Sequence, residues 1–543
     1  MKKLKLFAIV VLILLTIHVS AAFEEKTINA LAVSTQGNYG VVIKIVVNVT
    51  PGSGKVFVST PPLVQIDMQS SAQLAAITAC DLLGLDFSDY NFYYDIESDV
   101  GLVGGPSAGA VMTVATIAVF KDLTLNKDVY MSGTIIPGGF VGPVGDLNYK
   151  LEAAAKNGCK IFLIPKGQSI SKVTKRVGNV TAIEIVNLKN LARKYNIDLH
   201  EVETIGEALY YYTGYKLQTL NVTLNMTSYK AIFKKMNDRM ISDVNELKTK
   251  VYTYGKSEKA EEFISEAMNF TNSSYYYSST CRLFLSKVYL RWELYNHTIK
   301  DKTSFNRECE DIQADIDAMK MHLKFTRIGV NSFQILAAVE ERLMMAEESL
   351  KEAKKLYPTN VSEALYDLAY AKERFETART WWRVKEDLND YALLSKEELE
   401  KRVRFYLSHA DSMILYATYL YGNEALLKGA DEYHDKARKL LDDGFIPGSF
   451  AAAVDSIVEA SMSIEVYYSD VNKSVDAYRE MSKVAIKNAE KTTTPVLPAA
   501  YYEFAHVQKD VYSELHYYEL ALRLAELLNS ISKIKVANVI VVS

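Results

Sequence analysis

Cysteine is scarce in this sequence, with four residues in a chain of 543. Four thiols are too few for a disulfide-stapled scaffold, and their spacing is not that of a metal site. They are Cys80, Cys159, Cys281 and Cys309. In an oxidising compartment Cys281 and Cys309 could bridge neighbouring helices, and four buried free thiols are the alternative. Nothing in the sequence indicates a metal or a cofactor.

An excess of positive charge is also missing. The chain has 62 basic and 66 acidic residues, a formal net charge of -4, and no basic block. Nucleic-acid binding requires a clustered positive surface, so the sequence argues against a nucleic-acid partner. The length and the 49% hydrophobic content are instead typical of two to four globular domains.

Glycine and proline almost vanish beyond about residue 229, where long helical patterns run to about residue 530. One apolar seam repeats every three or four residues: Leu336, Val339, Leu343, Ala346, Leu350 and Ala353. This coiled-coil-like seam should end at Pro358. Without a fixed repeat, residues 229–530 are predicted to form a bundle or irregular array of antiparallel helices. Residues 531–543 are expected to form a short strand-like tail.

Tyrosine, by contrast, is abundant, with 36 residues that often occur in pairs. Tyrosine suits wet helical grooves and interfaces, because its ring is apolar and its hydroxyl polar. The alternative is that these tyrosines form the core edges of amphipathic helices.

A hydrophobic run long enough to span a membrane comfortably is lacking at the N-terminus. A lysine-rich start precedes an apolar stretch from Leu6 to Val19, which closes on the small residues 20–22. This pattern predicts a cleaved signal peptide over residues 1–22, with an uncleaved membrane anchor as the alternative. Both place the remainder of the chain outside the cytoplasm.

Glycosylation sequons support that placement, because they are more frequent than composition alone would give. The Asn-X-Ser/Thr triplets begin at Asn48, Asn179, Asn221, Asn225, Asn269, Asn272, Asn296, Asn360 and Asn472. Pro51 follows the threonine of the first triplet and makes it the weakest acceptor.

Short strand-like and helical patterns alternate over residues 25–215, which predicts a mixed α/β or α+β domain. Residues 51–54, Pro-Gly-Ser-Gly, predict a hairpin between the strands on either side. A helix should follow, capped by Ser70 or Ser71 and stopped at Gly84.

A candidate nucleophile lies in residues 105–109, Gly-Pro-Ser-Ala-Gly, which match the glycine-x-serine-x-glycine pattern. The match alone is weak, because small residues also permit a close backbone approach. An apolar helix over residues 110–120 would place Ser107 at a helix N-terminus. Unpaired amides there could stabilise a tetrahedral oxyanion.

A nucleophilic serine needs a base, and histidine is nearly absent from this region. Only His200 of the eight histidines lies in it, which leaves a Ser–His esterase or amidase as an alternative. Lys150 is the other candidate, in the first turn of a helix that Asp146 can cap and Gly158 can end. The helix dipole and burial would both favour its neutral amine, the form that accepts a proton. A first-turn surface lysine remains the structural alternative.

Three segments together resemble a known family: residues 105–109, residues 128–135 (DVYMSGTI) and residues 142–165 (GPVGDLNYKLEAAAKNGCKIFLIP). They look like the proteolytic domain of Lon-type proteases, and the resemblance covers residues 25–215. It implies an α+β domain that often assembles as a ring of six.

The resemblance also implies a serine–lysine dyad, with Ser107 as nucleophile and Lys150 as general base. A hydroxyl residue at the position of Ser132 commonly supports the lysine in that family, and Thr134 lies close by in the sequence.

The sequence departs from the family at several points. Gly104 stands where many members have an acidic residue, and residues 146–149 carry less charge than usual. The ATPase module of Lon-type proteases would require a glycine-x4-glycine-lysine-serine/threonine loop. Residues 51–56 fail this pattern because position 49 is valine, and residues 254–257 fail because position 250 is lysine.

The sequence therefore predicts an extracytoplasmic serine endopeptidase, secreted or membrane-anchored, without an ATPase of its own. Its expected substrates are unfolded proteins or peptides, and it is expected to form a homo-oligomer. The alternative from another class is a non-catalytic surface scaffold that binds a partner through the helical domain.

Overall fold

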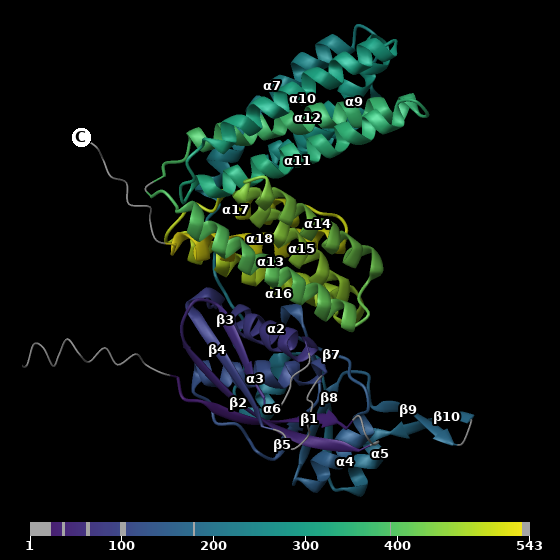
Figure 1. Ribbon diagram of the computed structural model, residues 1–543, viewed down its shortest axis with the longest axis vertical. Coiled ribbons are helices and arrows are strands. Elements are labelled where there is room, and N and C mark those ends of the chain that lie inside the picture. Colours follow the sequence, from purple (N-terminus) through teal and green to yellow (C-terminus); the bar gives the residue numbers. More distant parts are fainter. Residues whose placement is uncertain are drawn as a thin grey trace, which may run out of the picture. The chain divides into compact units, whose positions relative to one another are not determined.

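The computed structural model describes residues 23–34, 39–60, 66–97, 105–177, 180–390 and 392–534. The chain divides into two compact units, residues 1–219 and 220–543 (Figure 1). The first is mixed α/β and the second is helical, as the sequence predicts. The predicted signal peptide, residues 1–22, lies outside the described residues.

A four-stranded sheet in the order β1-β2-β4-β3 opens the first unit. Its strands are β1 (Lys26–Val33), β2 (Gly40–Pro51), β3 (Lys55–Ser59) and β4 (Tyr90–Glu97). The predicted hairpin through residues 51–54 is wrong, because β4 lies between β2 and β3. The turn instead wraps around the start of β4, where the Gly54 amide donates to the Tyr90 carbonyl (2.8 Å).

Two buried helices, α2 (Ile66–Leu83) and α3 (Gly109–Lys121), pack against each other in this unit. α2 begins at Ile66, ahead of the predicted cap at Ser70 or Ser71. Both serines are buried inside the helix, so that capping prediction is wrong. Gly84 follows the last helical residue with φ of 65°, which confirms the predicted stop.

A smaller parallel sheet, in the order β11-β8-β5, completes the first unit. The remaining strands are β5 (Val129–Met131), β6 (Thr134–Ile136), β7 (Phe140–Gly142), β8 (Ile161–Pro165), β9 (Ile170–Val177), β10 (Val180–Asn187) and β11 (Asp198–Val202). The remaining helices are α4 (Leu147–Lys156), α5 (Leu188–Lys194) and α6 (Ile205–Thr213). Leu151 of α4, Phe162 of β8 and Leu188 of α5 share one buried core.

The second unit is built from helices α7 to α18 (Figure 1). They are α7 (Thr227–Val251), α8 (Glu258–Asn272), α9 (Tyr276–Thr298), α10 (Lys302–Lys324), α11 (Ser332–Leu356), α12 (Val361–Glu386), α13 (Lys396–Tyr419), α14 (Glu424–Asp442), α15 (Ile446–Tyr468), α16 (Val471–Ala489), α17 (Val496–His506) and α18 (Val511–Ser532). α18 reaches Ser532, inside the segment predicted as a tail, and residues 535–543 lie outside the described part.

The predicted apolar seam lies on α11, where all six of its residues are buried. The helix ends at Leu356, two residues before Pro358, as expected. α11 packs along α12 and also contacts α15, which in turn contacts α13, α14 and α18. This contact pattern makes α11 and α15 central elements of the helical unit.

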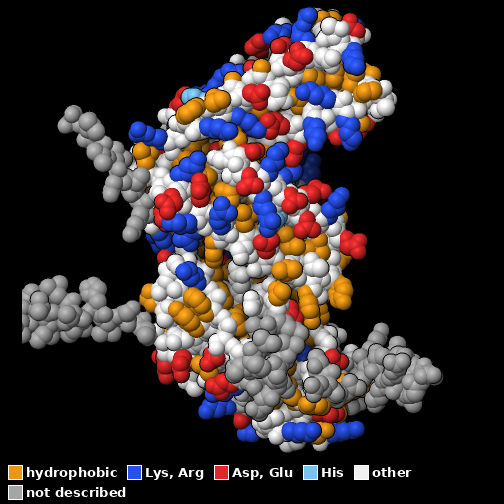
Figure 2. Space-filling view, in the orientation of Figure 1, with side chains coloured by type: hydrophobic (Ala, Val, Ile, Leu, Met, Phe, Trp, Pro, Cys, Tyr) orange, Lys and Arg blue, Asp and Glu red, His pale blue; other side chains and the backbone are white. Residues whose placement is uncertain are grey.

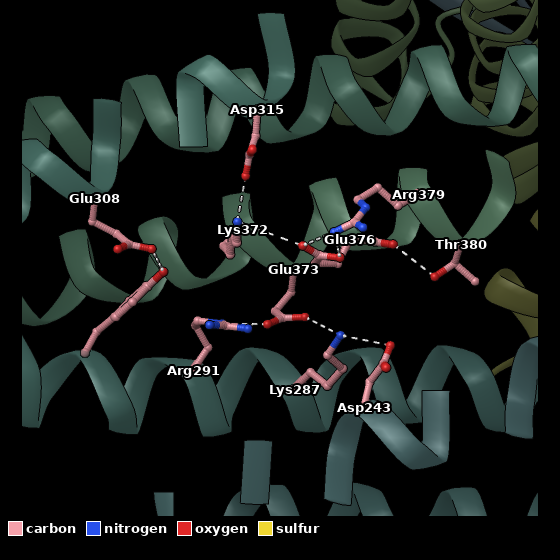
Figure 3. Close-up of polar contacts among 11 residues, drawn as sticks. Asp243, Lys287, Arg291, Glu308, Asp315, Lys372, Glu373, Glu376, Arg379 and Thr380 are labelled. Carbon is pink, nitrogen blue, oxygen red and sulfur yellow. Dashed lines mark hydrogen bonds and ion pairs between the residues drawn. The ribbon is translucent and has the colours of Figure 1, made fainter. Parts of the chain in front are cut away.

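A buried ion cluster joins α12 to α9 (Figure 3). Glu373 is fully buried, and its carboxylate forms ion pairs with the Arg291 guanidinium at 2.6 Å and the Lys287 ammonium at 2.8 Å. Burial acts to raise the pKa of Glu373, but the two cations outweigh it and hold the pKa below its usual value. The neighbouring Lys372 pairs with Asp315 of α10 at 2.8 Å. Adjacent residues of α12 therefore bind two different helices.

Acidic and basic side chains are interspersed over the face of the helical unit seen in Figure 2. Among the described residues, no helix has the length and apolarity needed to cross a membrane. No disulfide joins the cysteines of the described residues, so Cys281 and Cys309 form no bridge here. Burial raises the pKa of each of these two thiols to about 11.

Candidate active site

Ser107 lies in a 3₁₀ turn, Pro106–Ala108, that leads directly into α3. Gly105 enters the turn with φ of 93°, a conformation that glycine adopts without strain. Pro106 then fixes the first helical position. Ser107 is half-buried, and its hydroxyl makes no hydrogen bond to another described residue.

Two backbone hydrogen bonds hold this turn against the segment between β5 and β6. The Gly133 amide donates to the Ser107 carbonyl (3.0 Å), and the Ala110 amide donates to the Gly133 carbonyl (3.1 Å). A Cβ on Gly109 would lie 2.7 Å from the Ser71 hydroxyl and 2.8 Å from Cγ2 of Ile135. The small residues around Ser107 therefore permit a close approach of α3 to β6.

Lys150 projects from the first turn of α4 and is only 5% exposed. Its amine donates to the hydroxyl of the fully buried Ser132 at 3.1 Å. Ser132 immediately precedes Gly133, which is bonded to the Ser107 backbone. These two residues separate β5 from β6, and the gap between the strands brings the Lys150 and Ser107 segments together.

Thr134, the neighbouring hydroxyl residue, belongs to a different contact. Its hydroxyl donates to the Pro143 carbonyl at 3.2 Å. Of the two hydroxyl residues, Ser132 is therefore the one that meets the lysine.

Burial lowers the pKa of Lys150 from 10.5 to about 8, and the Asp146 carboxylate opposes the shift. A substantial fraction of the amine is thus neutral near pH 8. Asp146 itself does not cap α4 as predicted. It occupies the N-cap position with φ of 58°, and its side chain makes no capping hydrogen bond. A capping side chain normally reaches the first amides of a helix from an extended backbone, whereas the Asp146 backbone is left-handed.

The surrounding sequence decides the family of this region. Residues 23–195 match the family model of the Lon protease (S16) C-terminal proteolytic domain. These residues are a Lon-type proteolytic domain.

Similar curated proteins carry the same name. An archaeal Lon protease of Halobacterium salinarum is 29% identical over 149 residues, which cover 26% of this chain and 20% of that protein. An archaeal Lon protease of Archaeoglobus fulgidus is 26% identical over 178 residues, or 32% of this chain and 28% of that protein. A Lon protease of Acinetobacter baumannii is 30% identical over 144 residues, 26% of this chain and 17% of that protein. The chain thus matches less than a third of the length of each of these relatives.

His200 lies elsewhere in the first unit. It is on β11, within 2.8 Å of the Asp198 carboxylate, and its ring packs against Tyr211 with centroids 4.7 Å apart. β8 separates β11 from β5, the strand that leads to Ser132. Among the described residues, no hydrogen bond or ion pair joins His200 to Ser107.

Two residues of α2, neither of them predicted from the sequence, position the Ser107 turn of the Lon-type domain. The Asp67 carboxylate accepts a hydrogen bond from the Gly105 amide (2.8 Å). The Ser71 hydroxyl donates a hydrogen bond to the Pro106 carbonyl (3.3 Å). They precede their partners by 38 and 35 residues. No local pattern signals such contacts, because they depend on how α2 packs. Gly104, the departure from the family pattern, lies outside the described residues.

Proposed function

We propose that this chain is a serine-type endopeptidase in which Ser107 is the nucleophile and Lys150 the general base. One observation carries the proposal. The buried Lys150, whose pKa is lowered, donates a hydrogen bond to Ser132. The next residue, Gly133, is hydrogen-bonded to the Ser107 backbone. The match of this region to a Lon proteolytic domain supports it.

The chemistry follows from the neutral amine. Lys150 takes the proton of the Ser107 hydroxyl as the oxygen attacks the peptide carbonyl. Backbone amides of the turn around Ser107 stabilise the oxyanion, and the ammonium returns its proton to the leaving amine. Water then hydrolyses the acyl-enzyme with Lys150 again as base. Ser132 orients the amine throughout by accepting its hydrogen bond.

The proposed substrates are unfolded segments and peptides, cleaved without ATP hydrolysis by this chain. The absence of a phosphate-binding loop from the 543-residue sequence supports cleavage without ATP hydrolysis by this chain.

We further propose that the chain forms a homo-oligomer. Light scattering would test this proposal.

We also propose an extracytoplasmic location, secreted or anchored. Most sequon asparagines among the described residues are exposed to solvent. The exposed ones are Asn221, Asn225, Asn269, Asn272, Asn360 and Asn472. Asn48 in β2 and Asn296 in α9 are half-buried, and Asn179 lies outside the described residues. A mass shift on treatment with a glycosidase would test the proposal in the native host.

The deciding experiment measures cleavage of casein and of a fluorogenic peptide library by the full chain without ATP. Ser107→Ala and Lys150→Ala should each lower kcat by about 10³-fold or more, because the two side chains act as a unit. Lys156→Ala, an exposed lysine in the last turn of α4, is the matched control and should leave cleavage unchanged.

His200→Ala should also retain activity, because the contacts of His200 are with Asp198 and Tyr211. Equal cleavage by wild type and Ser107→Ala would refute the proposal. A folded wild type that cleaves nothing would favour the non-catalytic scaffold.

A further inference from the structure

A cavity of about 320 Å³ lies inside the helical unit. Its walls come from α7, α9, α11, α12, α14, α15, α17 and α18. The volume is at the lower end of the ~300–1,000 Å³ range of small-molecule sites. The volume therefore suits a small ligand.

Apolar and aromatic side chains form most of the cavity wall. They include Met236, Met240, Phe284, Trp381, Phe504 and Leu520. Such a lining favours a ligand with an apolar or aromatic group.

Two of the charged residues on the wall neutralise each other. The Arg342 guanidinium lies 3.4 Å from the Glu341 carboxylate, and it also stacks over the Trp381 ring at 5.2 Å. Burial lowers the pKa of His516 to about 4, so its ring is neutral at physiological pH. These three residues leave no unmatched charge.

Asp455 is different, because it lines the cavity without a partner. This half-buried residue of α15 forms no hydrogen bond or ion pair with another described residue. Burial raises the pKa of its carboxyl well above 3.8, and the Glu341 and Glu459 carboxylates raise it further. The Lys436 and Arg342 cations oppose this shift without cancelling it, so ionisation of the Asp455 carboxyl still carries a cost. A bound ammonium would remove that cost.

Arg374 of α12 is the complementary group. Its guanidinium stacks on Phe284 at 4.2 Å and bonds the Tyr370 hydroxyl, but it pairs with no carboxylate of the described residues. Its Nε is buried without a hydrogen-bond partner. An arginine in this state favours a carboxylate ligand, which accepts two parallel hydrogen bonds.

Tyr517 of α18 also lines the cavity. Burial raises the pKa of its hydroxyl to about 12, while Arg374 acts to lower it and Asp455 to raise it. The hydroxyl is therefore within electrostatic reach of both groups. One cavity thus presents an unpaired carboxylate, an unpaired guanidinium and an apolar wall.

We propose that this cavity binds a zwitterion with an apolar side chain, a free α-amino acid or a short peptide. Its ammonium pairs with Asp455, its carboxylate pairs with Arg374, and its side chain lies against Met240 and Trp381. The site is contained in residues 220–543, so it stands independently of the peptidase proposal.

Isothermal titration of the full chain with L-phenylalanine, the other apolar L-amino acids and their dipeptides tests the proposal. Phenethylamine lacks the carboxylate of phenylalanine, and 3-phenylpropionate lacks its ammonium. Each should bind at least about tenfold more weakly than the zwitterion, because a charged hydrogen bond is lost. Amino acids and dipeptides are compared in the Ser107→Ala chain, which should bind as wild type does and cannot cleave the dipeptides by the proposed route.

Two variants assign the two ends of the ligand. Asp455→Asn should weaken the binding of phenylalanine about tenfold and leave the binding of 3-phenylpropionate unchanged. Arg374→Gln should weaken the binding of phenylalanine and leave the binding of phenethylamine unchanged. The matched controls are Asp431→Asn on α14 and Arg383→Gln on α12, two exposed residues. Phenethylamine or phenylpropionate binding as tightly as the amino acids would overturn the proposal. Absence of binding by every zwitterion at millimolar concentration would do the same.

Discussion

At the scale of single residues, the Lys150 amine is the group on which the proposed chemistry depends. It is buried beside Ser132, and that burial lowers its pKa to about 8. Only the neutral amine can take the Ser107 proton. The fraction of active enzyme therefore grows as the pH rises.

We expect kcat/KM for a fluorogenic peptide to rise about a hundredfold from pH 6 to a plateau above pH 8, following the neutral fraction. Activity rises with pH because protonation removes the base. The midpoint of the profile reports the pKa of Lys150. Circular dichroism at each pH controls for unfolding. A flat profile between pH 6 and 9, or one that falls, would exclude Lys150 as the base.

Ser132 is a positioning residue, and its loss should move the midpoint of the pH profile. An acceptor hydrogen bond favours the charged ammonium, so Ser132→Ala should lower the lysine pKa and shift the midpoint to lower pH. It should also reduce kcat about tenfold or more through misorientation of the amine. Thr134→Val is the control, because that hydroxyl bonds Pro143 rather than Lys150. A merely structural role for Ser132 would reduce activity with no change in midpoint.

At the scale of elements, the contact between α3 and β6 depends on glycine. Gly109→Ala would place a methyl group 2.7 Å from the Ser71 hydroxyl and 2.8 Å from Cγ2 of Ile135. We expect a loss of about 1–3 kcal/mol in the free energy of unfolding, together with reduced activity as the Ser107 turn shifts. Gly145→Ala, where an added Cβ meets nothing within 4 Å, is the control for both measurements. Equal stability of the two variants would contradict the close approach.

The pairing of α9 with α12 depends on Glu373. Glu373→Ala leaves the buried Lys287 and the Arg291 guanidinium without their carboxylate (Figure 3). Such a loss costs about 3–5 kcal/mol in the free energy of unfolding, measured by denaturant titration. Glu397→Ala breaks an exposed pair with Lys401 and should change stability little. A similar effect of both substitutions would show that the buried cluster contributes no more than a surface pair.

At the scale of the whole molecule, the chain is two units with separate cores. Leu151 and Phe162 belong to a core of the first unit, and Met240 and Leu283 belong to one of the second. We expect calorimetry to resolve two unfolding transitions. Gly109→Ala should lower the midpoint of one, and Glu373→Ala that of the other. A single transition that both variants shift equally would show that the units unfold as one.

What the sequence determined by itself is local in the chain. The turn before α3, the α11 seam and the lysine in the first turn of α4 were predicted, because residues a few positions apart fix them. The fold class of each unit follows from the same short-range periodicities. The family resemblance could be predicted too, since its motifs are short and ordered.

Tertiary structure decided which segments meet. β3, the strand after Pro51, pairs with β4 rather than with β2. The Asp146 backbone is left-handed, and its side chain does not form the predicted cap. The support of the Ser107 turn by Asp67 spans 38 residues. Asp455 of α15 and Arg374 of α12 line one cavity, although their helices are far apart in the chain. Sequence patterns specify which face of an element is buried, but the partner on that face is selected by packing of the whole unit.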